Sequence, residues 1–352
     1  MIAGVSKRFI KMKIKKSLSY DDVLLVPKYS EIKSRSTVNT NVKLGKFTFN
    51  HPVIPANMKT VTGEEMAEFI YNSKGLAILH RFMTIDEQVS IVKRMFEKYP
   101  DSSNYVAVSV GVKKEDEENI SKFLDAGVKI FCIDVAHGDS LQCINMIKHI
   151  KSFRLSPEPF VIAGNVATGS AAKRLWQAGA DAVKVGIGPG SLCSTRVETG
   201  NGVAQLSAVS EVFDSRKENN FTDKYIIADG GIKYAGDVVK CLCFADMAMI
   251  GNLFAGTNET PGTILHVNGV ACKEYAGSST HKTTHIEGVS ALVPTKGSAA
   301  DILDKLLQGL KSGCSYQGVN NIKDLQNDPE FIEITSSGLK ESHPHNPFTI
   351  GS

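Results

Sequence analysis

YIIADGGIKYAGDVVKCLCFADMAMIG (residues 225–251) contains two short apolar runs with a helix-like segment between them. Nearly continuous apolar runs of this length are expected of parallel strands that are buried on both faces. A strand, a helix and a second parallel strand form the repeating unit of α/β folds. The stretch therefore predicts a sheet that is built from such units.

The same alternation extends through most of the chain. Eight apolar runs, most of them followed by an amphipathic segment, occupy residues 51–56, 76–80, 105–111, 130–135, 159–165, 181–188, 225–231 and 246–251. Eight successive strand–helix units predict an α/β fold of the (β/α)₈ TIM-barrel type. A doubly wound open sheet is the structural alternative. The amphipathic segment 298–313 is expected to pack on the barrel as a helix.

One barrel accounts for most of the 352 residues, because a barrel with additional segments reaches this size as a single domain. The cationic stretch KRFIKMKIKK (residues 7–16) belongs to a basic N-terminal arm, residues 1–18, which we expect to be solvated. Residues 19–352 form a single catalytic barrel domain, with a short flap at residues 278–297 and a C-terminal tail.

The composition favours a cytoplasmic protein. Seven cysteines without CxxC pairs indicate a reducing compartment rather than a disulfide framework. The first ten residues lack the apolar core of a secretory signal, and no run of about 18 apolar residues predicts a membrane span. The formal net charge of +3 is nearly neutral, so we expect neither nucleic acid nor a membrane as a partner.

Polar residues and glycine-rich turns follow the predicted strands. In a barrel, the carboxyl ends of all strands meet at one rim, where the active site lies. Three turns, GPGS, ADGGIK and IGNLFAG, are rich in glycine and can present backbone N–H groups to a phosphate. No turn has a GxGxxG that opens a helix, so a Rossmann dinucleotide site is not indicated. The pattern predicts a phosphorylated ligand.

Cys193 differs from the other six cysteines in its surroundings. It lies in the loop GIGPGSLCSTRVETGNG (residues 186–202). Hydroxyl side chains, among them Thr195, surround it in the sequence, and Arg196 follows three residues later. The other cysteines lie in apolar segments, where a thiol is usually buried and inert. A thiolate in a polar loop can act as a nucleophile, so Cys193 is the candidate for covalent catalysis.

These residues resemble the IMP dehydrogenase/GMP reductase family. The resemblance rests on the Cys193 loop together with AGNVATG, IADGGIKYAGDVVK, MIGNLFAGTNETPG and KEYAGSS, and extends from residue 19 to residue 345. It implies a (β/α)₈ barrel, assembled as a homotetramer, that binds a purine 5′-monophosphate and a nicotinamide cofactor. It also implies that Cys193 attacks purine C2, and that the loop glycines let the loop move around the covalent intermediate.

The resemblance also assigns binding residues. For the substrate, GMP or IMP, it implies Asn57, Met58, Ser191, Asp229, Gly230, Gly231, Gly251, Asn252, Tyr275, Gly277 and Ser278. For the nicotinamide cofactor it implies Asp134, Ala136, His137 and Asn165. For K⁺ it implies the backbone carbonyls of Gly188, Gly190 and Cys193. NADPH is the expected cofactor, with NADH and NAD left open.

The family contains two branches, which share the cysteine adduct. Dehydrogenases oxidise IMP and hydrolyse the adduct with a water activator, an Arg-Tyr pair on a long flap; reductases deaminate GMP and have no hydrolysis step. Here the flap segment between Ser279 and Glu287 is only THKTTHI and lacks Arg-Tyr, and residues 83–104 leave no space for a CBS module. The sequence therefore favours the reductase branch.

In that branch we expect Thr195 and Glu287 to protonate the departing amine while Cys193 attacks. The alternative activity is that of an IMP dehydrogenase. Two alternatives of other classes are a flavin enzyme, because phosphate-binding barrels also hold FMN, and a purine nucleotide-binding protein without turnover.

Overall fold

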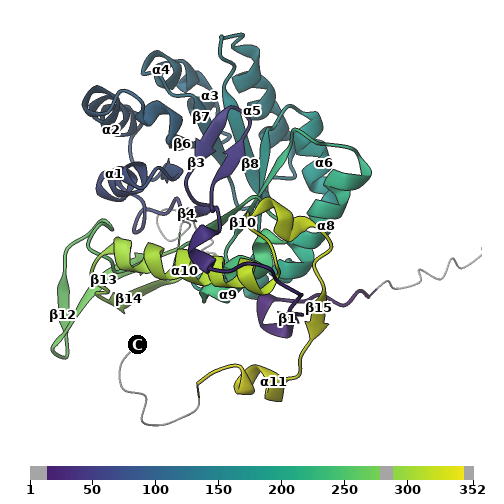
Figure 1. The fold of residues 1–352 in the computed structure, drawn as a ribbon. Helices are drawn as coiled ribbons and strands as arrows, with labels where there is room; N and C mark the ends of the chain where they lie inside the picture. Colours follow the sequence, from purple (N-terminus) through teal and green to yellow (C-terminus); the bar gives the residue numbers. More distant parts are fainter. Residues whose placement is uncertain (1–13, 278–287, 345–352) are drawn as a thin grey trace, which may run out of the picture.

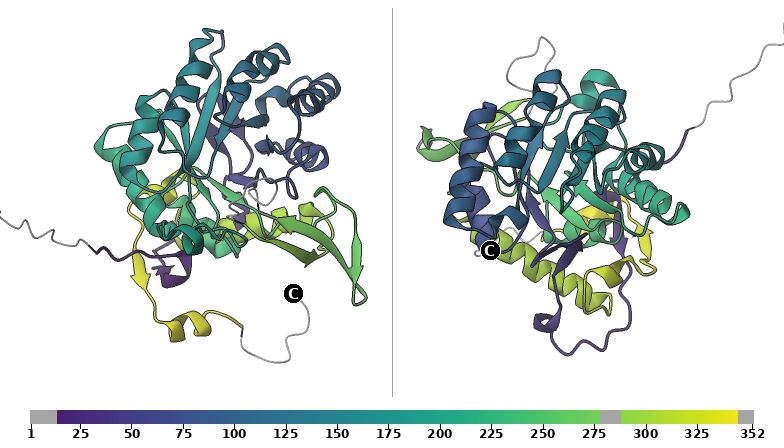
Figure 2. Two further views of the ribbon diagram at one scale, coloured as in Figure 1. Left: turned by 180° about the vertical axis from the view of Figure 1, so that it is seen from behind. Right: turned by 90° about the horizontal axis from the view of Figure 1, so that it is seen from above.

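The computed structural model of the chain describes residues 14–277 and 288–344. At its centre, eight parallel strands lie in the order β4-β11-β10-β9-β8-β7-β6-β5, with helices around them (Figures 1 and 2). The two end strands, β4 and β5, pack next to each other, so the sheet forms a nearly closed barrel. The predicted (β/α)₈ barrel is confirmed, and the open sheet is excluded.

Each of the eight apolar runs coincides with one barrel strand, and only β8 extends beyond its run, by one residue. The strands are β4 (Val53–Pro55), β5 (Ala77–Leu79), β6 (Val106–Val110), β7 (Ile130–Asp134), β8 (Phe160–Val166), β9 (Ala182–Val185), β10 (Tyr225–Asp229) and β11 (Met247–Ile250). Almost every strand residue is buried, as two covered faces require. The half-buried exceptions are Tyr225 at one end of β10 and Asp134, Asn165 and Asp229 at the carboxyl ends.

Besides the short α7 (Thr195–Thr199), nine helices of the described chain surround this sheet or connect its strands. They are α1 (Glu64–Asn72), α2 (Ile85–Lys98), α3 (Lys114–Glu118), α4 (Ile120–Asp125), α5 (Leu141–Ser152), α6 (Gly169–Gln177), α8 (Gln205–Glu218), α9 (Ala235–Leu242) and α10 (Ala299–Tyr316). The expected helix of residues 298–313 is α10. A Cβ at Gly309 would lie 2.3 Å from the Cβ of Ala235, so glycine permits the close packing of α10 on α9.

A β-hairpin covers the amino end of the barrel. Its strands are β2 (Val42–Leu44) and β3 (Phe47–Phe49). The ring of Phe47 packs edge-on against Phe160, the first residue of β8, at 5.8 Å between centroids. Phe49 packs in the same way against Tyr105, which precedes β6, at 6.0 Å. The hairpin thus places aromatic side chains over the amino end of the barrel.

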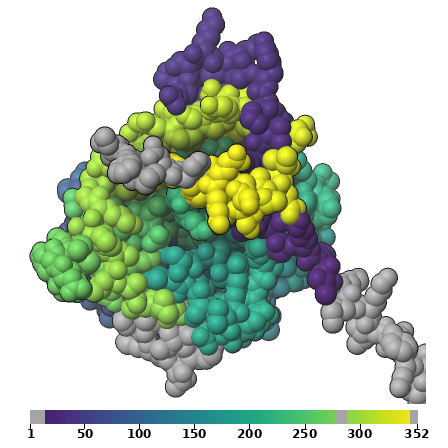
Figure 3. Space-filling model, turned by 90° about the horizontal axis from the view of Figure 1, so that it is seen from below, coloured from purple at the N-terminus to yellow at the C-terminus, as the bar shows by residue number. Residues whose placement is uncertain are grey.

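The two terminal segments pack against each other outside the barrel. Strand β1 (Val23–Leu25) pairs antiparallel with β15 (Phe331–Glu333), which precedes α11 (Ser336–Glu341). Figure 3 shows the C-terminal residues, in yellow, beside the N-terminal ones, in purple. Of the basic arm, residues 1–13 lie outside the described residues, whereas the N–H of Leu18 donates to Ser207 of α8 at 2.8 Å.

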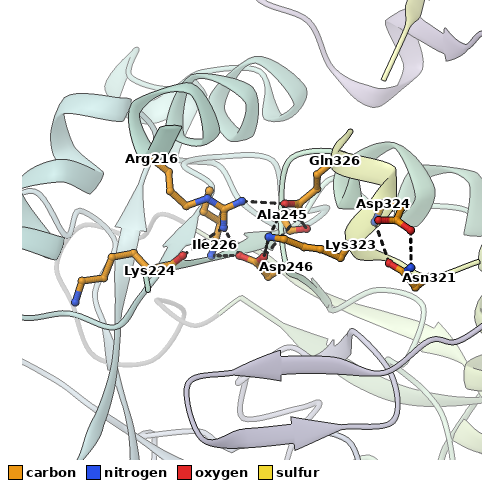
Figure 4. Close-up of polar contacts among 9 residues, drawn as sticks. All are labelled: Arg216, Lys224, Ile226, Ala245, Asp246, Asn321, Lys323, Asp324 and Gln326. Atoms are coloured by element: carbon orange, nitrogen blue, oxygen red, sulfur yellow. Dashed lines mark hydrogen bonds and ion pairs between the residues drawn. The ribbon is translucent and has the colours of Figure 1, made fainter. Parts of the chain in front are cut away.

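A buried polar network ties the segment near the C-terminus to the amino end of the barrel (Figure 4). Asp246, just before β11, accepts hydrogen bonds from the Arg216 guanidinium at 2.6 Å and from the Ile226 N–H at 2.8 Å. Gln326, in the 3₁₀ turn η4 (Lys323–Gln326), accepts from Arg216 and donates to the Ala245 carbonyl. Shorter 3₁₀ turns are η1 (Tyr20–Asp22), η2 (Arg35–Thr37) and η3 (Ser102–Asn104).

A three-stranded antiparallel sheet projects from the carboxyl end (Figure 1). It consists of β12 (Leu265–Val267), β13 (Val270–Ala276) and β14 (Ser290–Pro294). The expected flap, residues 278–297, follows β13; its residues 278–287 lie outside the described residues, and much of its second half is β14. Within the described chain, no helix has the length and apolar character that a membrane span requires.

Candidate active site

Cys193 lies exposed in the loop between β9 and the short helix α7 (Thr195–Thr199). The other six cysteines are buried, as their apolar surroundings predicted. The thiol of Cys193 donates to the hydroxyl of Thr195, with 3.1 Å between Sγ and Oγ1. A thiol that faces solvent and contacts a hydroxyl group can reach a ligand and exchange a proton beside it.

Arg196 holds the Cys193 loop in shape. Its Nε donates to the carbonyl of Ile187 at 3.1 Å, and its second guanidinium nitrogen donates to the carbonyl of Val203 at 2.5 Å. A Cβ at Gly188 would lie 2.4 Å from Arg196 Cγ, and one at Gly202 would lie 2.6 Å from it. Loop motion was the expected reason for the glycines; close packing around Arg196 is an additional reason at these two positions.

The Cys193 loop pairs with the described part of the flap, at residues 288 and 289. Cys193 forms an antiparallel bridge with Gly288, and the N–H of Val289 donates to the carbonyl of Leu192 at 3.1 Å. The N–H of Gly277 donates in turn to the carbonyl of Val289 at 3.1 Å. Of the expected site residues, Ser278 and Glu287 lie outside the described residues.

Four residues that the resemblance assigned to the substrate meet beside this loop. The hydroxyls of Ser191 and Tyr275 lie 3.4 Å apart. A Cβ at Gly251 would be 2.7 Å from the Tyr275 hydroxyl and 3.4 Å from the sulfur of Met58, so both side chains border this glycine. Burial raises the pKa of Tyr275, so its hydroxyl stays protonated at neutral pH. The hydroxyls of Ser191 and Tyr275 can therefore both donate hydrogen bonds beside the backbone of Gly251.

The other two glycine-rich turns also lie against each other. Gly230 and Gly231 have φ angles of +90° and +79°, which glycine adopts readily. A Cβ at Gly230 would lie 3.1 Å from Pro189 and 3.3 Å from the N atom of Gly190. Asn252 lies at the edge, with an exposed side chain and a carbonyl that accepts from Lys296. The turns after β9, β10 and β11 thus form one glycine-rich rim, the usual place for phosphate in this fold.

Beneath the rim, two carboxylates share one lysine. The ammonium of Lys184 lies 2.7 Å from Oδ2 of Asp229 and 3.1 Å from Oδ1 of Asp134. Asn165 donates to the same Oδ2 of Asp229 at 2.9 Å and to the carbonyl of Gly186 at 2.7 Å. Asn57 is buried below and donates to Ser109 at 2.8 Å.

The pKa values of Lys184 and Asp134 favour the charged forms of these two groups. Burial alone would lower the pKa of Lys184, but Asp229 and Asp134 raise it above its ordinary value. Burial alone would raise the pKa of Asp134, but Lys184 and then Arg81 lower it below its ordinary value. An ammonium between two carboxylates can therefore persist at low exposure.

Sequence reasoning missed Lys184, although a signal was present. The residue interrupts the apolar run DAVKVGIG, where a charged side chain requires a partner. Its exposed fraction is only 2%. The partners could not be identified from the sequence, because they lie on β7 and β10.

On the cofactor side, Ala136 and His137 are exposed in the loop after β7. The turn that follows packs closely on Asn165, whose carbonyl accepts from the N–H of Gly138 at 2.7 Å. Arg81 joins this side through its Nε, which donates to the carbonyl of Asp134 at 3.0 Å. A separate cavity of about 780 Å³ beside the mouth is lined by Lys59, His80, α2 and other residues, none of them an expected site residue.

The fold and the site define a (β/α)₈-barrel enzyme with an exposed thiol, a glycine-rich rim and a buried charged cluster. The sequence pattern of the IMP dehydrogenase / GMP reductase domain matches residues 17–345. The chain belongs to this family of oxidoreductases.

Individual relatives are named as reductases. The GMP reductase of Streptococcus equi subsp. zooepidemicus (strain H70) is 43% identical over 316 residues, which cover 87% of this chain and 92% of the relative. The GMP reductase of Streptococcus agalactiae serotype III (strain NEM316) is 43% identical over 325 residues, or 90% of this chain and 95% of that one. A crystal structure of a GMP reductase variant from Trypanosoma brucei with guanosine 5′-monophosphate is also similar, with a TM-score of 0.87 and 27% identity, and the match covers 95% of this chain and 98% of that one.

Proposed function

We propose that the chain is an NADPH-dependent GMP reductase, which converts GMP to IMP and ammonia through a covalent bond between Cys193 and purine C2. The observation that carries the proposal is the position of the Cys193 thiol. It is exposed, lies 3.1 Å from the Thr195 hydroxyl, and belongs to the loop that contains Ser191 of the glycine-rich rim. Relatives named GMP reductase at 43% identity support the same activity.

The rim would bind the phosphate of GMP. Backbone N–H groups of the turns after β10 and β11, with the hydroxyls of Ser191 and Tyr275, would supply the hydrogen-bond donors. Asp229, below the rim, would accept hydrogen bonds from the ribose hydroxyls. The base would then extend toward Cys193, with Met58 and Gly277 at its border. Gly230, Gly231, Asn252, Asn57 and Ser278 keep their proposed substrate roles.

The chemistry requires a nucleophile and a proton donor near C2. The Cys193 thiolate forms a bond to C2, and the amino group leaves with a proton as ammonia. Thr195 and Glu287 would handle that proton; Gly288, the chain neighbour of Glu287, is bridged to Cys193. When hydride has replaced the amino group, the bond to sulfur breaks, the thiolate leaves, and IMP remains.

NADPH would supply the hydride when bound. The residues present fit a nicotinamide, because Oδ1 of Asn165 is buried and accepts no hydrogen bond from the described residues. The carboxamide of a nicotinamide carries N–H donors that would satisfy such an oxygen. Asp134, Ala136 and His137 would complete this side, and Arg81 adds a positive charge at its mouth.

A K⁺ ion would suit the carbonyls of Gly188, Gly190 and Cys193. Carbonyl oxygens are hard ligands, and each has two lone pairs, so that of Gly190 can accept from the N–H of Cys193 and still face a cation.

We further propose a homotetramer in the cytoplasm. The free state of all seven cysteines, six of them buried, supports a reducing compartment.

The test uses two parallel assays at 340 nm with the purified full chain. NADPH with GMP should lose absorbance and yield IMP and ammonia, whereas NAD with IMP should yield no XMP. Cys193→Ala should abolish turnover, and Cys143→Ala, at a buried cysteine, serves as the control. XMP formation would instead identify an IMP dehydrogenase. GMP binding without NADPH oxidation would identify a nucleotide-binding protein, and a yellow preparation a flavin enzyme.

A further inference from the structure

Three neighbouring strands bring Lys184 into contact with two carboxylates. In the sheet register, Asp134 of β7 lies opposite Gly164 of β8, and Gly164 lies opposite Lys184 of β9. Asp229 ends β10, the strand on the other side of β9. From β9, the ammonium of Lys184 therefore reaches past β8 to Asp134 on β7. On the other side of β9 it reaches Asp229 on the adjacent strand β10.

Gly164 leaves the space that this crossing requires. A Cβ at Gly164 would lie 2.7 Å from the Cβ of Lys184 and 2.6 Å from its carbonyl oxygen. Such distances are far below van der Waals contact, so a side chain at this position would displace the lysine. The register and the missing side chain together direct Lys184 between the two carboxylates.

The ion pairs also orient Asp229. Its Oδ2 accepts from the Lys184 ammonium and from Nδ2 of Asn165. Among the described residues, no donor to its Oδ1 is found, and the side chain is 19% exposed. One carboxylate oxygen is therefore held from below and the other is available to a ligand from above.

We propose that Lys184 is the positioning residue for ribose recognition, because it fixes Asp229 so that Oδ1 faces the two ribose hydroxyls of the nucleotide. Lys184 does not touch the nucleotide, since its side chain is only 3% exposed. Through Asp134, the same ammonium ties the substrate half of the site to the cofactor half. The inference rests on the proposed binding of GMP and names the residue on which ribose selectivity depends.

Charge-assisted hydrogen bonds lose much of their strength when the acceptor can rotate away. Without the ammonium, Asp229 retains only Asn165 as an anchor, and two carboxylates face each other without a cation. The contribution of the ribose hydroxyls should fall, whereas phosphate and base contacts should persist. A purely structural lysine would weaken the binding of all nucleotides equally.

The test is the ratio of dissociation constants for 2′,3′-dideoxy-GMP and GMP, measured by calorimetry on the full chain without cofactor. The ratio should be about 10 to 100 for the native chain, given the strength of hydrogen bonds to charged groups, and should approach unity for Lys184→Met. Lys184→Arg, which keeps a cation, should restore part of the ratio. Lys240→Met is the matched control, because Lys240 also pairs with a buried aspartate, Asp237, away from the site.

If Lys184→Met does not fold, the double variant Lys184→Met/Asp134→Asn removes one charge of each sign and still leaves Asp229 without its lysine partner. Circular dichroism and thermal unfolding report on folding in each case. A folded variant with the native ratio would overturn the inference and leave the proposed function intact. A native chain that binds neither nucleotide would overturn the proposed function, and the inference with it.

Discussion

The thiol of Cys193 lies 3.1 Å from the hydroxyl of Thr195, two residues further along the chain. Because α7 begins at Thr195, the hydroxyl is fixed on a helical turn while the thiol remains in the loop. The pair provides a nucleophile and a proton-exchanging group on one short segment, as the proposed reaction requires.

Replacing Thr195 with valine removes the hydroxyl and keeps the shape of the side chain. We expect kcat for NADPH oxidation to fall about 100-fold, in the range typical of a lost proton-transfer group, with little change in the KM for GMP. Ser194→Ala is the control, because Ser194 makes no side-chain cap hydrogen bond to α7. Equal kcat values for Thr195→Val and the native enzyme would remove Thr195 from the mechanism.

The contact between Gly251 and Tyr275 predicts a defect in GMP binding. In Gly251→Ala the new methyl group would lie 2.7 Å from the Tyr275 hydroxyl, so the tyrosine must shift away from Ser191. A strained packing change of this kind costs about 1–3 kcal/mol, and we expect the KM for GMP to rise about tenfold or more. Steady-state kinetics with varied GMP provide the measurement.

Gly236→Ala is the matched control for this prediction, because a Cβ there meets no atom within 4 Å. Its KM for GMP should equal that of the native enzyme. If both variants behave alike, the rim does not bind the substrate as proposed.

The network in Figure 4 predicts a loss of stability without a loss of chemistry. Asp246→Asn would leave the guanidinium of Arg216 buried without its carboxylate; the two side chains are 9% and 7% exposed. Breaking a buried pair lowers the free energy of unfolding by about 3–5 kcal/mol. Urea unfolding provides the measurement, and kcat per folded molecule should not change, because the network lies at the amino end of the barrel.

Glu118→Gln serves as the control for Asp246→Asn. Glu118 pairs with Lys114 at 3.7 Å on the surface, where an ion pair contributes only about 0–1 kcal/mol. A similar stability loss in both variants would contradict the role assigned to the buried network.

Two buried histidines predict weaker folding in mild acid. Burial lowers the pKa of His51 to about 4, and burial with the nearby Lys59 lowers that of His80 to about 4. The unfolded chain binds these protons near pH 6.5, so below that pH it holds more protons than the native state and the free energy of unfolding falls. Each histidine should lower the free energy of unfolding by up to about 1.4 kcal/mol per pH unit between pH 6 and 5.

Urea unfolding at pH 7, 6 and 5 tests this expectation. His51→Gln removes one titrating imidazole. The number of protons taken up on unfolding, read from the slope of the free energy of unfolding against pH, should therefore fall by up to one. A native chain with the same free energy of unfolding at pH 7 and pH 5 would show that neither histidine is shielded from protonation as the structure indicates.

Much of the architecture could be predicted from the sequence alone. The eight strands are short and buried on both faces, so each leaves a run of apolar residues that a reader can recognise without coordinates. Cys193 could be singled out for the opposite reason: its neighbours are glycine and hydroxyl residues, and the structure places it alone among the cysteines at the surface.

The tertiary structure alone decided how distant residues meet. Lys184 appears in the sequence as one charge in an apolar run, and only the register of β7, β8 and β9 shows that Gly164 opens its path to Asp134. Ser191 and Tyr275 are 84 positions apart and meet because the end of β13 lies beside the Cys193 loop. Local patterns record burial and conformation, whereas contacts across the barrel depend on strand register and on missing side chains, which no single segment encodes.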